Sequence, residues 1–253
     1  MRKIAFVNEK GGSCKTTLSV NIASYFAARG GKRVLLIDFD PQGQSGKSLG
    51  IDVKSAKVTT LELLMDPNVK VADAAMPTRI ENLDIIVSNK TLTDFPTQVA
   101  DDENRNARLR DKLRGLRGYD YLIFDAPPSM GLITINIMLG AGEIIIPVNL
   151  TYLALDGCAE IVETVGAVKK NLGNRALQIS LVLPVLYRNT RLANAILQKL
   201  SDFFGDKLSK NVLGYNVIVD EAQSYGKTVW EYAPNSRGAQ VFEAIAKEID
   251  ALG

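Results

Sequence analysis

The sequence predicts a doubly wound α/β fold, with a mostly parallel sheet and helices on both faces. Strand-like and helix-like segments alternate along the chain, which favours parallel strands joined by right-handed helical crossovers. Several strand candidates are continuous apolar runs such as RVLLID (33–38), and these are typical of strands buried on both faces. No repeat, low-complexity tract or linker-like stretch divides the pattern, so we expect one domain over residues 1–253.

The elements follow one another regularly from the N-terminus. KIAFVN (3–8) is the first strand candidate, and a helix over about 15–29 follows it, with Leu18, Ile22 and Phe26 on one face and a glycine pair at its end. After 33–38, the remaining strand candidates are 83–88, 121–125, 143–148 and 179–185. The remaining helical patterns lie at about 101–115, 131–139, 155–171, 190–204 and 236–251.

The composition restricts the chemistry of the chain. The 253 residues include no histidine, which excludes His-based catalytic triads and nearly all zinc catalysis. No apolar run approaches the roughly 18–20 residues of a membrane span, and the start lacks the apolar core of a signal peptide. The two cysteines have no disulfide or metal-ligand spacing, which favours a reducing, cytoplasmic location. A net charge of +2 means that nucleic-acid binding would need a local basic patch.

The loop NEKGGSCKTT (8–17) follows the first strand and opens the first helix. It departs from the usual phosphate-loop pattern, because Glu9 and Cys14 stand where that pattern has glycines. Even so, successive backbone N–H groups from Gly11 to Thr16 at a helix N-terminus predict an anion cradle. Lys15 could then reach the β- and γ-phosphates, and the Thr16 hydroxyl could ligate Mg²⁺. The competing interpretation is a glycine-containing turn with a solvated lysine.

Three acidic residues follow the ends of other strands. Asp38 ends one strand and Asp40 lies two residues beyond it, while Asp125 ends the strand YLIFD. Because the carboxyl ends of parallel strands meet at one sheet edge, we expect these side chains to converge on the phosphate loop. Carboxylates in that place suit contact with a Mg²⁺ ion that keeps several of its waters. An isolated aspartate at a strand end would instead be a turn or cap residue.

Together, KGG-x-x-KTT, DFDPQGQS and DAPPS resemble the ParA/Soj/MinD family of deviant Walker ATPases, and ParA/Soj-type partition ATPases most of all. The resemblance extends over nearly the whole chain, including IPVNLTYLALDG and EAQSYGKTVWEYAPNSRGAQVF. It implies the P-loop NTPase variant of the α/β fold. It also implies ATP and Mg²⁺ as ligands and hydrolysis of ATP to ADP and phosphate.

The resemblance also implies roles for individual residues. Lys10 is the extra lysine of this family and would reach across a dimer interface to the partner's ATP. Lys15 would bind phosphate in its own subunit, and Asp40 would position the attacking water. The metal would be held by Thr16, with support from Asp38 and Asp125. The residues expected to contact nucleotide are Lys10, Gly11, Gly12, Ser13, Cys14, Lys15, Thr16 and Thr17.

Cys14 has two interpretations. In the first, a small residue is tolerated because the backbone there keeps a negative φ. In the second, the helix N-terminus and the lysines lower the pKa of the thiol, which makes the ATPase sensitive to oxidation.

The resemblance further implies a homodimer with ATP, non-specific DNA binding, a ParB-like stimulating partner and a cytoplasmic location on the nucleoid. The densest basic stretch is NRNARLRDKLRGLR (104–117), which is either a DNA-binding surface or a solvated helix face. Tyr215 and Ile218 stand where many ParA-like relatives carry arginines, so the DNA surface is expected to be shifted, weakened or absent. The adenine pocket is expected between 184–189 and 214–220.

Three alternatives remain open at this point. A MinD-like positioning ATPase would act on a membrane or protein surface, but the acidic polar face of the last helix disfavours anionic lipid, so we expect no membrane binding. An iron–sulfur electron carrier would need cysteines after Asp125, and none follows there closely. An ATP-dependent amidoligase would need a second substrate region, for which only residues 50–80 offer room.

Overall fold

The computed structural model describes residues 1–253 and is built on one eight-stranded sheet. The strand order is β3-β4-β2-β5-β1-β6-β7-β8, and all neighbours are parallel except the antiparallel pair β3–β4. The strands are β1 (Arg2–Phe6), β2 (Val34–Asp38), β3 (Met76–Pro77), β4 (Leu83–Ile86), β5 (Tyr121–Asp125), β6 (Glu143–Asn149), β7 (Gln178–Tyr187) and β8 (Leu213–Gly214). The predicted doubly wound α/β fold is therefore confirmed.

The sheet is covered by helices of very different lengths. The long ones are α1 (Lys15–Ala28), α7 (Leu132–Gly140), α8 (Ala154–Asn171), α9 (Arg191–Phe204), α10 (Val217–Ser224) and α12 (Arg237–Asp250). The short ones are α2 (Gln44–Ser48), α3 (Thr60–Met65), α4 (Val71–Ala74), α5 (Phe95–Gln98), α6 (Arg108–Lys112) and α11 (Val229–Tyr232), together with the 3₁₀ turns η1 (Lys90–Asp94) and η2 (Gly205–Lys207).

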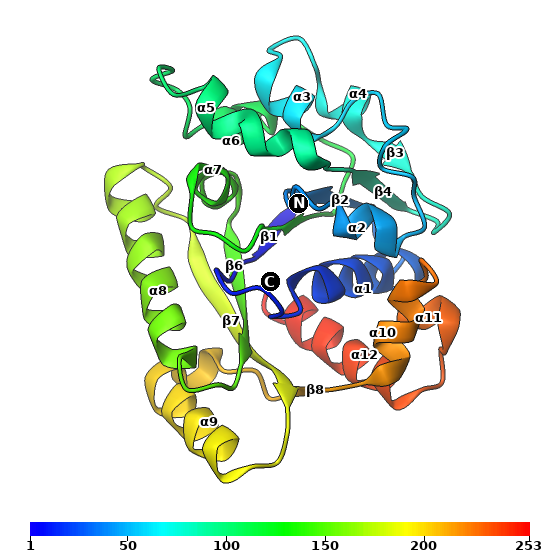
Figure 1. Ribbon diagram of the computed structural model, residues 1–253, viewed down its shortest axis with the longest axis vertical. Helices are drawn as coiled ribbons and strands as arrows, with labels where there is room; N and C mark the ends of the chain where they lie inside the picture. Colours follow the sequence, from blue (N-terminus) through cyan, green and yellow to red (C-terminus); the bar gives the residue numbers. More distant parts are fainter.

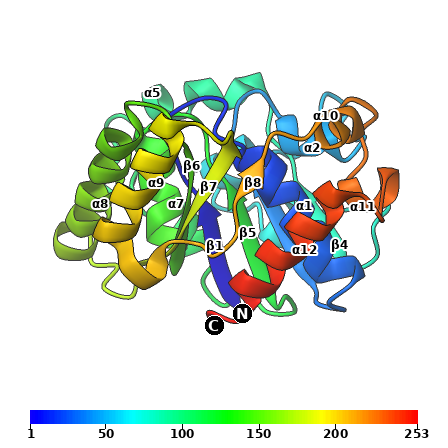
Figure 2. The same ribbon diagram turned by 90° about the horizontal axis from the view of Figure 1, so that it is seen from below.

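Two apolar cores lie on the two faces of the sheet. One contains α7, α8 and α9 with the short helices α3 and α6, and the other contains α1, α11 and α12. Figures 1 and 2 show these two groups on opposite sides of the strands, with both chain termini together at one end of the molecule. The strands β2 and β5 are buried along their whole length, as their apolar sequences predict, and β1 is buried over its last three residues.

The C-terminal helix α12 packs against α1 rather than projecting into solvent. Its apolar stripe of Phe242, Ile245 and Ile249 is fully buried in the second core. No helix of the protein combines the length and the apolar character needed to cross a bilayer.

One long helix was predicted wrongly. Residues 101–107 form turns, and only Arg108–Lys112 of the predicted 101–115 helix is helical. The Asp102 carboxylate explains the interruption, because it accepts a hydrogen bond from the Asn104 backbone N–H at 2.9 Å and pairs with Arg108 at 2.7 Å. Such local bonds from Asp compete with helix formation. The patterns at 15–29, 131–139, 155–171, 190–204 and 236–251 correspond to helices within one or two residues of their predicted ends.

Candidate active site

The phosphate loop lies where β1 ends and α1 begins, at the carboxyl edge of the sheet (Figure 1). Its start is fixed by Asn8, whose side chain donates to Pro147 O at 2.7 Å and accepts from the Lys10 backbone N–H at 2.9 Å. Beyond Lys10, none of the backbone N–H groups from Gly11 to Thr17 donates to a protein acceptor. Seven successive unpaired donors at a helix N-terminus are suited to bind an anion.

Lys15 is folded back over this loop. Its ammonium donates to the Lys10 carbonyl at 3.1 Å, and Ser13 Oγ donates to the same carbonyl at 3.0 Å. Burial lowers the pKa of Lys15, while Asp125 and Asp40 act in the opposite direction. The side chain is 7% exposed, so this lysine is held inside the site and is not the solvated lysine of the competing interpretation.

The backbone conformation and the pKa of Cys14 contradict both interpretations of this residue. Its φ is +59°, in the left-handed region, so the backbone does not keep the negative φ that the first interpretation assumed. This geometry explains why the usual loop has glycine there, since a Cβ in this conformation costs roughly 1–2 kcal/mol. The second interpretation fails because burial, together with the negative charge of Asp220, raises the pKa of the thiol to about 11. Cys14 is a strained and unreactive residue.

The three aspartates converge as predicted. Asp38 and Asp125 are directly opposite each other on the neighbouring strands β2 and β5, and both are fully buried. Asp40 lies in the following turn, with its backbone N–H on Asp38 Oδ1 at 2.9 Å. Asp40 and Asp125 both act on the charge of Lys15, which places them beside the phosphate loop.

Burial is the main perturbation of the two strand-end carboxyls. It raises the pKa of Asp38 well above its usual range, and the neighbouring Asp125 charge adds to this effect. Burial also raises the pKa of Asp125 to about 6, opposed by hydrogen bonds from the Thr16 and Ser45 side chains. Two adjacent buried carboxylates need positive charge near them, which is what a cation would supply.

A hard divalent ion fits this donor set better than a soft one. The site offers the Thr16 hydroxyl and aspartate oxygens, and the structure contains no cluster of three or more His, Cys, Asp or Glu side chains that would enclose a metal. Mg²⁺ takes oxygen ligands, keeps several waters and is commonly shared with phosphate. Thr16, with Asp38 and Asp125 behind it, is therefore suited to a magnesium ion bound jointly with a nucleotide.

Lys10 does not turn toward its own phosphate cradle. Its ammonium donates to the carbonyl of Leu153 at the start of α8, and its side chain lies about 3.5 Å from the space that a Cβ on Gly157 would fill. The Lys10 ammonium therefore makes one hydrogen bond, to a backbone carbonyl, and has no carboxylate partner within the chain.

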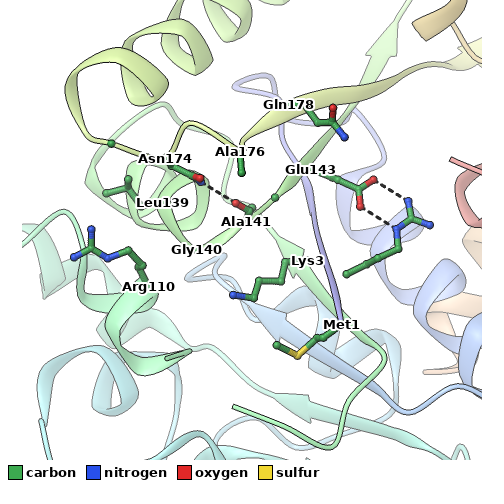
Figure 3. A pocket seen from close by; sticks show the side chains of 13 residues that line it. Met1, Lys3, Arg110, Leu139, Gly140, Ala141, Glu143, Asn174, Ala176 and Gln178 are labelled. Carbon is green, nitrogen blue, oxygen red and sulfur yellow. Dashed lines mark hydrogen bonds and ion pairs between the residues drawn. The ribbon is translucent and has the colours of Figure 1, made fainter. Parts of the chain in front are cut away.

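The surface has several hollows, and two of them lie at opposite edges of the sheet. One, of about 430 Å³, lies at the carboxyl ends of β6, β7 and β8 and is lined by Leu186, Arg188 and Tyr215, so both loops expected to hold adenine meet there. The other, of about 530 Å³, lies at the opposite edge, where Lys3 and the Arg2–Glu143 pair border it (Figure 3). That edge is far from the phosphate loop, because Lys3 and Glu143 begin their strands whereas the loop follows a strand end.

The basic stretch 104–117 is largely occupied by contacts within the chain. Arg108 pairs with Asp102, Arg110 and Arg114 both pair with Asp111, and Lys112 donates to backbone carbonyls of the α3–α4 loop. Arg105 and Arg117 of this stretch are exposed and make no ion pair. Other exposed basic residues without an ion pair include Arg188, Arg191, Lys199, Lys207, Lys210, Lys227 and Arg237.

Comparison with known proteins places this geometry in a family. A family model described as an AAA domain matches residues 1–179. The sporulation initiation inhibitor protein Soj of Bacillus subtilis is 38% identical over 251 residues, covering 99% of this chain and 98% of that protein. The chromosome partitioning protein ParA of Caulobacter vibrioides is 34% identical over 252 residues, covering 98% and 94%. The chain belongs to the ParA/Soj family.

The fold of the chain is shared with proteins of solved structure. Cobyrinic acid a,c-diamide synthase from Mycobacterium smegmatis, solved with bound ADP and magnesium, superposes with a TM-score of 0.84 at 27% identity, covering 98% of this chain and 94% of that one. The ParA/Soj proteins are P-loop ATPases. The unpaired backbone N–H groups, Lys15 and the convergent aspartates of this chain are the residues expected of a P-loop nucleotide site.

Some residues of the site were not predicted from the ParA/Soj resemblance. Ser45 contacts both buried carboxyls, and Gln223 on α10 donates to Thr17 Oγ at 3.0 Å. Ser45 is the last residue of the motif DFDPQGQS. The motif predicts the loop after β2, but it does not predict the hydrogen bonds from Ser45 to Asp38 and Asp125. Gln223 lies in the segment EAQSYGKTVWEYAPNSRGAQVF, but the sequence does not indicate its contact with Thr17, which lies 206 residues away.

Proposed function

We propose that this protein is a ParA-like, Mg²⁺-dependent ATPase. It forms an ATP-sandwich dimer, binds DNA non-specifically and positions a cargo by partner-stimulated hydrolysis of ATP to ADP and phosphate. The observation that carries the proposal is the row of seven unpaired backbone donors from Gly11 to Thr17, at the N-terminus of a buried helix beside Lys15. That arrangement is a phosphate site.

The chemistry follows from what each group can do. The amides and Lys15 would bind the β- and γ-phosphates, and Thr16, Asp38 and Asp125 would hold a magnesium ion, which would supply positive charge beside them. Asp40 is the carboxylate available to orient the attacking water, because it lies in the turn beyond the buried pair and its Oδ1 accepts only the Gln42 N–H, at 2.8 Å. The hollow beside Arg188 and Tyr215 accepts the base.

The dimer is supported by what lies at the rim of the phosphate loop. Tyr152 is 82% exposed and Leu153 is 52% exposed, and both belong to the loop that Lys10 contacts. Large apolar side chains exposed next to a ligand site are typical of interaction surfaces. With ATP bound, Lys10 would leave the Leu153 carbonyl for the γ-phosphate in the partner subunit, which makes nucleotide the switch for dimerisation.

DNA binding is supported by the exposed basic residues that make no ion pair and by the names of the relatives. Arg188, Arg191 and Lys227 lie at or near the loops that end β7 and α10, and non-specific binding needs only several phosphate contacts. In the stretch 104–117, Arg108, Arg110 and Arg114 are held in ion pairs, so its contribution to DNA binding would come mainly from Arg105 and Arg117. We place the protein in the cytoplasm on the nucleoid, as one domain over residues 1–253 that works with a ParB-like adaptor.

ATP turnover with and without non-specific duplex DNA tests this function. We expect slow turnover that rises with DNA, and ATP-dependent retention of DNA that falls steeply as salt increases. An Arg191→Ala, Lys227→Ala variant should lose retention while keeping turnover in the absence of DNA, because neither residue lines the hollow proposed for the base. An Arg110→Ala, Arg114→Ala variant, which removes the same number of charges from the internally paired stretch, is the matched control. ATP turnover without any DNA retention at low salt would remove the DNA claim and favour a MinD-like positioning ATPase.

A further inference from the structure

Ser45 is the one residue that donates to both buried carboxyls of the site. Its backbone N–H donates to Asp38 Oδ2 at 3.0 Å, and its hydroxyl donates to Asp125 Oδ2 at 2.8 Å. The residue is fully buried, so water does not compete for either hydrogen bond. Hydrogen bonds to buried carboxylates are among the stronger ones in proteins.

The surrounding backbone fixes Ser45 in this place. Gly43 precedes α2 with φ +62°, and a Cβ on it would lie 2.6 Å from the Ser88 carbonyl. Gly46 follows, and a Cβ there would lie 2.5 Å from the Val53 side chain. Gly43 is therefore required both by its positive φ and by the lack of room for a Cβ, and Gly46 is required by the lack of room alone. The start of α2 is pressed against its neighbours, so the Ser45 hydroxyl has little freedom to move.

The two carboxyls differ in what Ser45 does for them. Asp38 has both oxygens bonded to backbone N–H groups, those of Asp40 and Ser45, so it organises the loop that carries Asp40. Asp125 is held only by hydroxyls: Ser45 donates to Oδ2 at 2.8 Å, and the Thr16 hydroxyl also bonds the carboxyl. Ser19 Oγ lies 3.3 Å from Oδ1, but its shorter contact is to the Lys15 carbonyl at 2.8 Å. The orientation of Asp125 therefore depends on side chains, and Ser45 makes a shorter bond than Ser19.

We propose that Ser45 is a positioning residue that orients the Asp125 carboxylate toward the magnesium site beside Thr16. A carboxylate has about four acceptor sites, so Asp125 can accept these hydroxyls and still keep a lone pair for a ligand of the metal. Removing such a partner of a metal-site carboxylate commonly lowers metal affinity 10- to 100-fold. The inference rests on the proposed Mg²⁺-nucleotide site, but not on dimerisation or DNA binding.

The test is the binding of mant-ADP, a fluorescent ADP analogue, as Mg²⁺ is titrated. For Ser45→Ala we expect the Mg²⁺ concentration at half-saturation to rise about tenfold, with the Mg²⁺-free affinity for mant-ADP unchanged. Ser48→Ala is the matched control, because Ser48 is a buried serine of the same helix that bonds neither carboxyl. Ser45→Cys keeps the volume with a weaker donor and should be intermediate; it replaces Ser45→Ala if that variant does not fold.

A double-mutant cycle separates positioning from a general structural effect. In an Asp125→Asn background, Ser45→Ala should cause no further change in the Mg²⁺ dependence, because the carboxylate that it orients has gone. An undiminished tenfold effect in that background, or equal half-saturation for Ser45→Ala and Ser48→Ala, overturns the proposal. Wild-type protein that binds mant-ADP with no Mg²⁺ dependence would instead contradict the proposed function.

Discussion

The two loops that meet at the candidate active site are built in opposite ways. In the phosphate loop, the backbone N–H groups from Gly11 to Thr17 have no partner in the protein, and two residues, Gly12 and Cys14, have positive φ. In the acid loop after β2, Asp38 has every oxygen paired, including its backbone carbonyl, which accepts from Thr60 at 2.6 Å. The phosphate loop has unpaired donors that can bind a ligand, whereas Asp38 of the acid loop has all its oxygens bonded within the protein.

This difference assigns the two loops different tasks. A row of free donors binds an anion and gains stability from it. A fully bonded carboxylate loop holds its geometry, which suits residues that must meet a reacting group at a fixed distance. Asp40 is positioned by the second kind of loop and Lys15 by the first.

Asp40→Ala should show the largest effect. It removes the side chain that orients water but leaves the Asp40 N–H to Asp38 in place. We expect kcat to fall about a thousandfold, within the range for a positioned general base, while ATP affinity changes little. Steady-state phosphate release and equilibrium ATP binding measure the two quantities. Near wild-type turnover would remove Asp40 from its assigned role.

The rate of Cys14 alkylation should differ from that of free cysteine by the next largest factor. With a pKa of about 11, the Cys14 thiol is almost entirely protonated at pH 7.5. In a Cys158→Ser background without nucleotide, we expect iodoacetamide to react at least about a hundredfold more slowly than with free cysteine. The rate should rise about tenfold for each pH unit between 7 and 10. Fast labelling at neutral pH would restore the idea of a reactive thiol.

Asp125→Asn should change how stability depends on pH in the absence of Mg²⁺. The folded pKa of Asp125 is about 6, above its ordinary 3.8, so its contribution to stability is fully present below about pH 4 and is lost as pH rises through 6. At pH 7 the variant should therefore be more stable than wild type by roughly 3 kcal/mol, and at pH 4 this advantage should vanish. Urea unfolding at both pH values with EDTA measures this. An advantage that is equal at both pH values would contradict the assigned cause.

The difference in stability between Cys14→Gly and Cys14→Ala should be the smallest of these effects. Both variants remove the thiol, but only glycine relieves the left-handed strain at φ +59°. We expect Cys14→Gly to exceed Cys14→Ala in free energy of unfolding by about 1 kcal/mol. Equal stability by denaturant unfolding would show that the loop carries no strain at this position.

The sequence predicts the parts of this molecule that depend on short-range patterns. The buried strands are visible as continuous apolar runs, and the convergence of Asp38 and Asp125 follows because parallel strands end at one edge. The left-handed Cys14 was missed because a positive φ depends on the path of the whole loop. Ser45 and Gln223 were missed because their partners lie 80 and 206 residues away. The helix over 101–115 failed through a local competitor, the Asp102 side chain.

The most direct test of the account is the mass of the Asp40→Ala protein in solution with ATP and Mg²⁺, measured by light scattering, with and without Lys10→Ala. The account predicts a dimer for Asp40→Ala, because slow hydrolysis keeps ATP in both sites. It predicts a monomer that still binds ATP when Lys10 is also replaced, because the lysine of each subunit then no longer reaches its partner's phosphates. A monomer in both cases, or a dimer that persists without Lys10, would contradict the two-subunit switch.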